Sequence, residues 1–334
     1  EYNTEKEAYE KQTESIGILR KVKRGDAWKN VRTGKSFYNS LNQMCIEIFR
    51  TEDKEIEHNF EFGRPVAFFA MLSEGEGKDG KALKFLNAKG TVSYVDGDRM
   101  VVALPKDDYV AEIANASNGD VAGGLGLHLS FDETSYRLMF DALERVTRAR
   151  GNRLAYLRDL FYSHQPAQHY SFSPMHFPWL NATQEKAVNE VLWTKDVMVV
   201  HGPPGTGKTT TLVEAISETL RRESQVLVCA QSNMAVDWIS EQLVDRGIPV
   251  LRVGNPTRVN DKMLSFTYER KFEAHPDYPQ LWSLRKAIRE MRSKRKRGSE
   301  SYHQQLDRLK SRAIELELRI NAELFGEARV IACT

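Results

Sequence analysis

Cysteines and long hydrophobic runs are scarce in this sequence, and each scarcity narrows the class of protein. The 334 residues contain three cysteines, Cys45, Cys229 and Cys333, which lie far apart in the chain. Such spacing favours buried thiols in a reducing compartment over a zinc cluster or a disulfide framework. No apolar run approaches the ~20 residues of a membrane helix, and no secretory signal is visible. We expect a protein without membrane spans, located in the cytoplasm or, in a eukaryote, the nucleus.

The sequence also has little net charge and does not begin with methionine. The formal net charge is only +2, so contacts with nucleic acid would have to come from local basic patches. The chain opens with Glu1 rather than Met, and we expect the natural N-terminus to be missing. A length of 334 residues leaves room for two or three domains that each bury a core. The sequence thus predicts a modular protein.

The predicted secondary structure of the first half of the chain changes twice, from helix to strands and back to helix. Residues 1–35 are rich in helix formers and are predicted to form a stalk helix. Residues 36–130 contain about six short β-rich runs, which we expect to close into a small antiparallel barrel. Asp96-Gly97 lies between two of these runs and predicts a type I′ hairpin turn. Residues 131–163 have apolar positions at helical spacing and predict a second stalk helix that pairs with the first.

The second half alternates strands with helices, which predicts a parallel sheet covered by helices. The α/β core is expected to begin with residues 164–260, whose first predicted strand is Val197 to Val200. Apolar residues then step by three and four along residues 261–324, which predicts an inserted antiparallel helical hairpin. Residues 325–334 return to the core with a last strand, and we expect the sheet to be unfinished where the chain stops.

The strongest chemical signal is a P-loop between an apolar strand and a helix. The glycines of such a loop let backbone N–H groups turn onto phosphate oxygens, and the helix N-terminus adds its positive dipole end. Lys208 is expected to reach the β and γ phosphates of ATP, and Thr209 to hold Mg²⁺, so these two residues are the predicted catalytic pair. The predicted nucleotide-binding residues are Gly202, Pro203, Pro204, Gly205, Thr206, Gly207, Lys208, Thr209 and Thr210.

Two further segments carry polar residues with two possible roles. Gln184 can complete a capping box with Asn181, and its amide can also pair with the N6 and N7 edge of adenine. The segment from Ser232 to Asp237 follows a strand, where parallel sheets bind ligands. Ser232 and Asn233 could donate to phosphates while Asp237 orients the next helix, or the segment could simply cap that helix. The residues alone do not decide whether the segment from Ser232 to Asp237 binds phosphates or only caps the helix.

The order of these segments resembles superfamily 1B helicases. The matching stretches are Leu180–Gln184, Gly202–Thr209, Ser232–Asp237 and Val330–Thr334. They are similar to the branch of the nonsense-mediated-decay helicase and the immunoglobulin mu-binding-protein helicase, and the β-rich module extends the similarity over essentially the whole chain. One departure is Gln231, which stands where the branch usually has Pro.

The resemblance implies a RecA-like core and an ATP-dependent helicase or translocase that moves 5′ to 3′ on single-stranded RNA or DNA. It also implies a second RecA-like domain of the same protein and a monomeric state. Within such helicases, the residue at Gln184 contacts adenine. The residues at Ser232, Asn233 and Thr334 line the path of the single strand.

No Asp-Glu pair that ends an apolar strand follows Lys208, although helicases use such a pair to hold Mg²⁺ and polarise water. We therefore expect the chain to be an N-terminal piece of a helicase, poorly able to hydrolyse ATP by itself. Two other functions stay open. One is a nucleic-acid-binding module with a regulatory P-loop, and the other is a ring-forming AAA ATPase, which shares the same P-loop sequence.

The densest basic run lies at the turn of the predicted hairpin. Such a run is often a solvated helix face, but beside a single-strand path it would bind phosphates without sequence preference. Glutamates of the partner helix, such as Glu315, Glu317 and Glu323, could neutralise part of the charge. The predicted contacts of this run are Arg292, Lys294, Arg295, Lys296 and Arg297.

Overall fold

The chain folds into two compact units, residues 1–145 and 146–334, each with its own hydrophobic core. In the described ranges, no helix has the length and hydrophobicity needed to cross a membrane. The computed structural model describes residues 2–7, 17–71, 83–118, 124–131, 134–162, 164–254, 259, 261–293 and 300–334.

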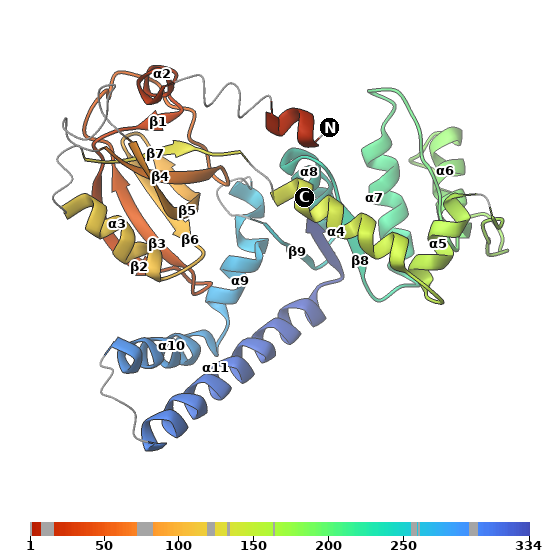
Figure 1. Cartoon of the computed structure of the whole chain (residues 1–334). Helices are drawn as coiled ribbons and strands as arrows, with labels where there is room; N and C mark the ends of the chain where they lie inside the picture. Colours follow the sequence, from red (N-terminus) through yellow and green to blue (C-terminus); the bar gives the residue numbers. More distant parts are fainter. Residues whose placement is uncertain are drawn as a thin grey trace. The chain divides into compact units, whose positions relative to one another are not determined.

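The first unit is built on a seven-stranded antiparallel sheet (Figure 1). Its strand order is β1-β7-β4-β5-β6-β3-β2. Alternating residues of these strands, together with side chains of a covering helix, form a dry core that includes Trp28, Phe68 and Ile113. The elements are α2 (Ile18–Lys23), β1 (Ala27–Trp28), β2 (Arg32–Tyr38), β3 (Met44–Phe49), β4 (Pro65–Met71), β5 (Leu83–Asp96), β6 (Arg99–Leu104), α3 (Asp108–Asn118) and β7 (Leu125–Leu129).

The predicted first stalk helix extends too far along the chain. Residues 2–7 are helical and α2 ends at Lys23, but Ala27 and Trp28 already pair with β7, and β2 begins at Arg32. Trp28 is 1% exposed, so burial of its ring in the sheet core outweighs the helix propensity of its surroundings. In the described strands the pairing runs from β1 to β2 without closing a ring, so the barrel stays a prediction.

The hairpin between β5 and β6 turns one residue later than predicted. Asp96 pairs with Arg99, so the two central residues of the turn are Gly97 and Asp98. Gly97 has a φ of +52°, whereas Asp98 is not among the described non-glycine residues with positive φ. Positive φ at the first central residue only is the requirement of a type II′ turn, so the predicted type I′ turn is wrong.

The N-terminal helical residues contact the helix that follows the sheet. This helix, α4, spans Thr134–Arg148. The ring of Tyr2 lies 5.2 Å from that of Tyr136 and 5.7 Å from that of Phe140, measured between centroids. These ring contacts involve Tyr2 alone, and Met139 and Leu143 of α4 are more than half exposed, so the pairing of two stalk helices stays a prediction.

A buried histidine should make this unit sensitive to acid. His128 of β7 is 8% exposed and contacts the rings of Phe69 and Phe85. Burial and the positive charge of Lys21 lower the pKa of His128 to about 4, although its Nδ1–H donates a hydrogen bond to the carbonyl oxygen of Leu129. The unfolded histidine keeps its ordinary pKa of 6.5, so as the pH falls the unfolded chain binds the proton first.

The contribution of His128 to the free energy of unfolding of the first unit is therefore expected to be constant above about pH 6.5 and to fall by roughly 3 kcal/mol towards pH 4. Hydrogen exchange of the β7 amides at several pH values would measure this loss. A His128→Leu variant should lose this part of the pH dependence. An unchanged slope in the variant would contradict the assignment.

The second unit contains a three-stranded parallel sheet, as the alternation of strands and helices predicts (Figure 1). The strand order is β8-β10-β9, so the last strand in sequence lies in the middle. The elements of the core are α5 (Arg153–Phe161), α6 (Ala182–Trp193), α7 (Lys208–Thr219), β8 (Val226–Cys229), α8 (Asn233–Asp245), β9 (Val250–Arg252) and β10 (Val330–Cys333).

The strand predicted at Val197 to Val200 is not formed. The segment belongs to no ladder among the described strands, and Val199 is 77% exposed. A strand needs a neighbouring strand to satisfy its backbone N–H and C=O groups, and hydrophobicity alone cannot supply that partner. The prediction from the apolar run is therefore wrong for this structure.

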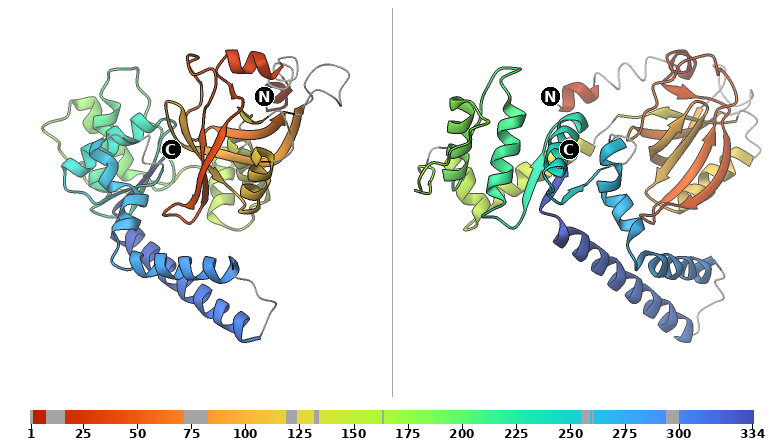
Figure 2. Two further views of the ribbon diagram at one scale, coloured as in Figure 1. Left: turned by 90° about the vertical axis from the view of Figure 1, so that its left-hand side faces the viewer. Right: turned by 180° about the vertical axis from the view of Figure 1, so that it is seen from behind.

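Between β9 and β10 the chain forms a helical extension with a core of its own. Its elements are η2 (Asp261–Phe266), α9 (Tyr268–Ala274), α10 (Tyr278–Ser293) and α11 (Glu300–Glu327). Leu281 and Ile288 of α10 share one buried cluster with Leu316 and Ile320 of α11. Figure 2 shows α10 lying beside α11. Because α11 continues to Glu327, it passes the boundary predicted at residue 324.

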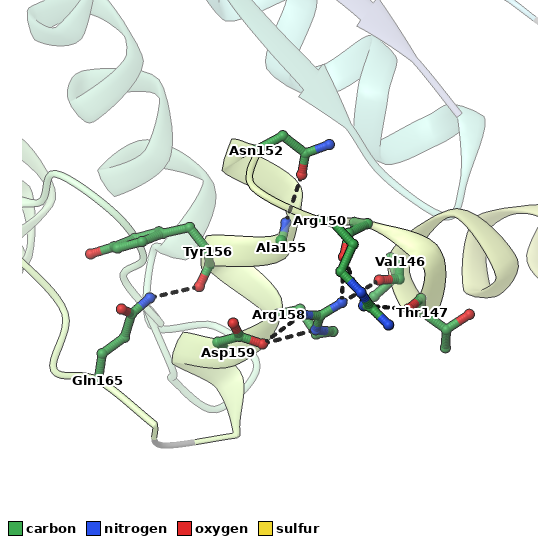
Figure 3. A network of polar contacts seen from close by, with 10 residues as sticks. Val146, Thr147, Arg150, Asn152, Ala155, Tyr156, Arg158, Asp159 and Gln165 are labelled. Atoms are coloured by element: carbon green, nitrogen blue, oxygen red, sulfur yellow. Dashed lines mark hydrogen bonds and ion pairs between the residues drawn. The ribbon is translucent and has the colours of Figure 1, made fainter.

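The turn from α4 into α5 is held by side chains that satisfy helix ends (Figure 3). The side chain of Asn152 accepts a hydrogen bond from the Ala155 N–H and caps the start of α5. Arg158 donates to the carbonyl oxygens of Val146 and Ala149, both at 3.0 Å. A guanidinium at a helix C-terminus satisfies its last carbonyls and complements its dipole. These contacts therefore satisfy the last carbonyl groups of α4 and the start of α5.

Candidate nucleotide site and adjoining sheet edge

The P-loop is shaped by two glycines with left-handed backbones. Gly205 and Gly207 have φ values of +81° and +78°, and Gly207 is the N-cap of α7. A Cβ at Gly207 would also lie 2.4 Å from the Gln184 amide nitrogen. The positive φ at both positions favours glycine, and a larger residue at Gly207 would in addition displace the Gln184 amide. The loop consequently delivers the N-terminus of α7, with its free N–H groups, to the place where phosphate would bind.

The ammonium of Lys208 lies inside this loop. Its Nζ donates to the carbonyl oxygens of Gly202 at 2.6 Å and Pro203 at 2.7 Å, and the Thr206 hydroxyl donates to Pro203 at 2.8 Å. Each contact is within the loop itself, so the cation is held at the centre of the predicted phosphate cradle. A positive charge, orphan N–H groups and left-handed glycines together fit the phosphates of a nucleotide.

Gln184 caps a helix, as the simpler of its two predicted roles requires, and it also contacts the P-loop. The side-chain Oε1 of Gln184 accepts a hydrogen bond from the backbone N–H of Asn181 at 3.2 Å. The backbone N–H of Gln184 donates to Asn181 Oδ1 at 2.9 Å, and the two bonds form the capping box of α6. The amide nitrogen donates to the carbonyl oxygen of Thr206 at 3.3 Å. The side chain thus ties α6 to the P-loop. Contact with adenine stays a prediction.

A buried carboxylate holds α7 between the segments before and after it. Glu214 of α7 is 3% exposed. Its Oε2 accepts from the indole Nε1–H of Trp179 at 2.9 Å and pairs with the guanidinium of Arg246 at 3.0 Å. Apolar contacts of Phe177, Val188 and Ala215 add a small core between α6 and α7. The helix that carries Lys208 is therefore braced on two sides.

The carboxyl edge of the sheet brings together two predicted strand-binding residues. Cys229 at the end of β8 is the register partner of Cys333 at the end of β10. Ser232 follows the first strand and Thr334 follows the second, and both residues are exposed. Ser232 accepts the Ala235 N–H at 3.2 Å and caps α8, as the simpler interpretation predicts. Contact of either residue with nucleic acid stays a prediction.

Asn233 and Asp237 belong to a buried hydrogen-bond network that the sequence motifs do not predict. Arg252 of β9 is fully buried, and its Nε donates to Asp237 Oδ1 at 2.8 Å. Its Nη2 donates to Asn233 Oδ1 at 2.8 Å, and its Nη1 to the Val253 carbonyl oxygen. The oxygen of the Asn233 amide is thus already used inside the protein. The sequence signal was one arginine within the apolar run Val250 to Val253.

Only one residue of the predicted basic run can be placed. Arg292 is exposed near the end of α10, whereas Lys294, Arg295, Lys296 and Arg297 lie outside the described residues. Of the glutamates expected to neutralise the run, Glu317 pairs with the buried Arg285 at 3.0 Å. The other two have different partners, since Glu315 pairs with Arg312 and Glu323 with His275. Phosphate contacts at the hairpin stay a prediction.

Comparison with known proteins points to one kind of ATP-binding domain. A family described as AAA domain matches residues 179–334. DNA polymerase alpha-associated DNA helicase A of Schizosaccharomyces pombe is 46% identical over 90 residues, which are 27% of this chain and 14% of that protein. DNA-binding protein SMUBP-2 of Rattus norvegicus is 31% identical over 144 residues, 43% of this chain and 15% of the relative.

A third similar protein is ATP-dependent helicase upf1 of Schizosaccharomyces pombe. It is 36% identical over 126 residues, which are 34% of this chain and 14% of the relative. The matched parts therefore span about one seventh of the length of these relatives. The family and the three names agree with the resemblance that the motif order indicates.

Proposed function

We propose that this chain, whose residues 179–334 are an AAA domain of the superfamily 1B helicase branch, is part of an ATP-driven helicase or translocase. The observation that carries the proposal is the placement of two kinds of residue on one α/β core. Lys208 lies in the P-loop, whose backbone suits the binding of phosphate. Ser232 and Thr334 lie at the carboxyl edge of the parallel sheet. Ligands of α/β sheets bind at that edge.

In this proposal ATP and Mg²⁺ supply the energy of phosphate cleavage and the charge that neutralises the phosphates. The chain's own residues bind and orient them. Lys208 would exchange the loop carbonyls for phosphate oxygens, Thr209 would ligate Mg²⁺, and the N–H groups from Gly205 to Thr210 would hold the phosphates. The Thr206 contact of Gln184 would transmit the state of the loop to α6.

The strand would lie along the edge that carries Ser232 and Thr334, with phosphates accepting hydrogen bonds from hydroxyl and backbone N–H groups. Such contacts do not read the base sequence. Movement along the strand requires a second domain that closes on the nucleotide and opens again after hydrolysis. We further propose that the whole protein carries this domain and acts as a monomer in the cytoplasm or nucleus.

Unwinding by the full-length protein tests this proposal. Duplexes with a single-stranded overhang at either end are incubated with the protein, Mg²⁺ and ATP, and strand separation is recorded by fluorescence. We expect separation of the duplex with the 5′ overhang and little of the one with the 3′ overhang. Strand separation without ATP would count against a helicase. So would a failure to separate either duplex, whether or not the protein hydrolyses ATP.

The adenine contact of Gln184 can be separated from its capping role by a matched pair of variants. Gln184→Ala removes both the cap and the proposed base contact, whereas Asn181→Ala breaks the same capping box and leaves the Gln184 amide in place. A bidentate base contact contributes about 1–3 kcal/mol, so Gln184→Ala is expected to reduce the preference for ATP over GTP by roughly 5- to 150-fold.

Asn181→Ala should destabilise α6 by about 1 kcal/mol and leave the ATP to GTP preference unchanged. Titration of this chain with fluorescent ATP and GTP analogues measures both affinities. Equal losses of preference in the two variants would assign Gln184 to capping alone.

A further inference from the structure

Two thiols meet at the carboxyl edge of the parallel sheet. Cys229 ends β8 and Cys333 ends β10, and their Sγ atoms are 3.5 Å apart. Cys229 is exposed and Cys333 is partly exposed, so a small reagent can reach the pair from solvent. The third cysteine, Cys45, is 1% exposed in the other unit, with its thiol 3.7 Å from the Gln43 carbonyl oxygen. The prediction of buried thiols therefore holds for Cys45 and is wrong for Cys229 and Cys333, which end strands at the open edge of the sheet.

The backbone already holds the pair at a distance that a disulfide can span. Register partners on neighbouring strands have Cα atoms about 5 Å apart, within the range of about 4.4–6.8 Å found in disulfides. Rotation of the side chains would have to bring the sulfurs about 1.5 Å closer to reach the bond length of about 2.0 Å. No shift of either strand is required. A bond between directly adjacent strands at an exposed edge belongs to the strained, reducible class.

We propose that Cys229 and Cys333 are a reversible redox modification site that takes two-electron thiol oxidants such as hydrogen peroxide. Two hydrogen-bonded features separate this pair from a chance contact. The Ala230 N–H donates to the Cys333 carbonyl oxygen, so the strands stay paired at the cysteines. The ladder also continues inward through Val228 and Ala332, which are buried, so the two thiols are held on a rigid support.

Cys229 is the first nucleophile because it is the more exposed of the two. Burial and the neighbouring Cys229 sulfur raise the pKa of the Cys333 thiol, which keeps it protonated while Cys229 reacts. The Cys229 thiolate attacks one peroxide oxygen, an S–O bond forms, the O–O bond breaks, and the leaving hydroxide takes a proton to become water. Cys229 is then a sulfenic acid.

Cys333 then resolves this intermediate. Its sulfur attacks the Cys229 sulfur, the S–S bond forms and the S–O bond breaks. The departing hydroxide combines with the thiol proton as water. In total two thiols and one peroxide yield one disulfide and two waters, with two electrons passing from sulfur to oxygen. A dithiol reductant such as dithiothreitol reverses the reaction by thiol–disulfide exchange.

The disulfide would fix the segments that lead to Ser232 and Thr334. Ser232 lies three residues after Cys229, and Thr334 is the residue after Cys333. We expect oxidation to restrict the adjustment of this edge to a bound strand and so to weaken strand binding. This consequence rests on the proposed function, whereas formation of the disulfide does not.

Thiol counting on the 334-residue chain tests the site directly. The reduced chain has three thiols, and mild peroxide should leave one, with a peptide cross-link between Cys229 and Cys333 found by mass spectrometry. Dithiothreitol should restore all three. A Cys333→Ser variant should instead trap a sulfenic acid at Cys229, captured with dimedone. The matched control Cys45→Ala should still form the cross-link.

Three thiols remaining after peroxide, or cross-links only between separate chains, would overturn the site. Binding of a fluorescent single-stranded oligonucleotide is then measured before and after oxidation. We expect at least fivefold weaker binding after oxidation, reversed by dithiothreitol and not seen in Cys333→Ser. Unchanged binding by the cross-linked chain would overturn the coupling. Absence of binding by the reduced chain would count against the proposed function and leave the thiol site intact.

Discussion

Replacement of Lys208 by alanine is expected to weaken the binding of ATP with Mg²⁺ to this chain by roughly 10- to 100-fold. Hydrogen bonds to charged groups contribute about 1.5–3 kcal/mol, and a loss of 1.4 kcal/mol corresponds to a tenfold change in affinity. The Lys208 ammonium lies within 2.7 Å of two loop carbonyl oxygens, so it already occupies the cradle that the phosphates would enter. Calorimetric titration with ATP measures the effect.

Lys186→Ala is the matched control for this experiment, because Lys186 is an exposed lysine on the neighbouring helix α6. It removes the same charge from the unit without touching the P-loop and should bind ATP like the natural chain. A Lys208→Ala variant that binds ATP within twofold of the natural chain would contradict the assigned site.

The second large effect is expected at the buried ion pair of Arg252 and Asp237. The Arg252 side chain is 0% exposed, so Asp237→Ala leaves its guanidinium buried and without the partner carboxylate. Removal of one partner from a buried pair costs about 3–5 kcal/mol, since the remaining charge stays desolvated. The free energy of unfolding of the second unit should fall by about that amount in urea denaturation.

A double variant distinguishes the loss of pairing from the loss of packing. Asp237→Leu combined with Arg252→Met replaces both charges by apolar groups and should recover most of the lost stability. Asp245→Ala is the control on the same helix. Asp245 pairs with Lys262 at 2.8 Å, but both side chains are about half exposed, so its removal should change stability little. Equal losses for Asp237→Ala and Asp245→Ala would contradict the buried-pair account.

The P-loop could be predicted because its information is local. Gly205, Gly207 and Lys208 lie within four residues, and each answers a requirement of the loop backbone or of the phosphate. The start of α6 follows from a local signal too, because Asn181 and Gln184 have the spacing of a capping box in the sequence. Local signals of this kind need no knowledge of distant contacts.

What the sequence missed depends on partners far along the chain. Arg252 joins a residue 15 positions away, and Cys229 meets a residue 104 positions away. The turn at Gly97 was shifted by one residue because cross-strand pairing, not the dipeptide, sets the register. The apolar run at Val197 failed as a strand for the same reason, since a ladder partner cannot be read from the run itself.

ATP hydrolysis by the full-length natural protein, measured with and without a single-stranded oligonucleotide, shows whether the P-loop drives a helicase motor. We expect turnover that the oligonucleotide stimulates severalfold or more and that Lys208→Ala abolishes. Turnover of equal rate with and without the strand would contradict a helicase motor. So would strand-stimulated turnover that survives in Lys208→Ala.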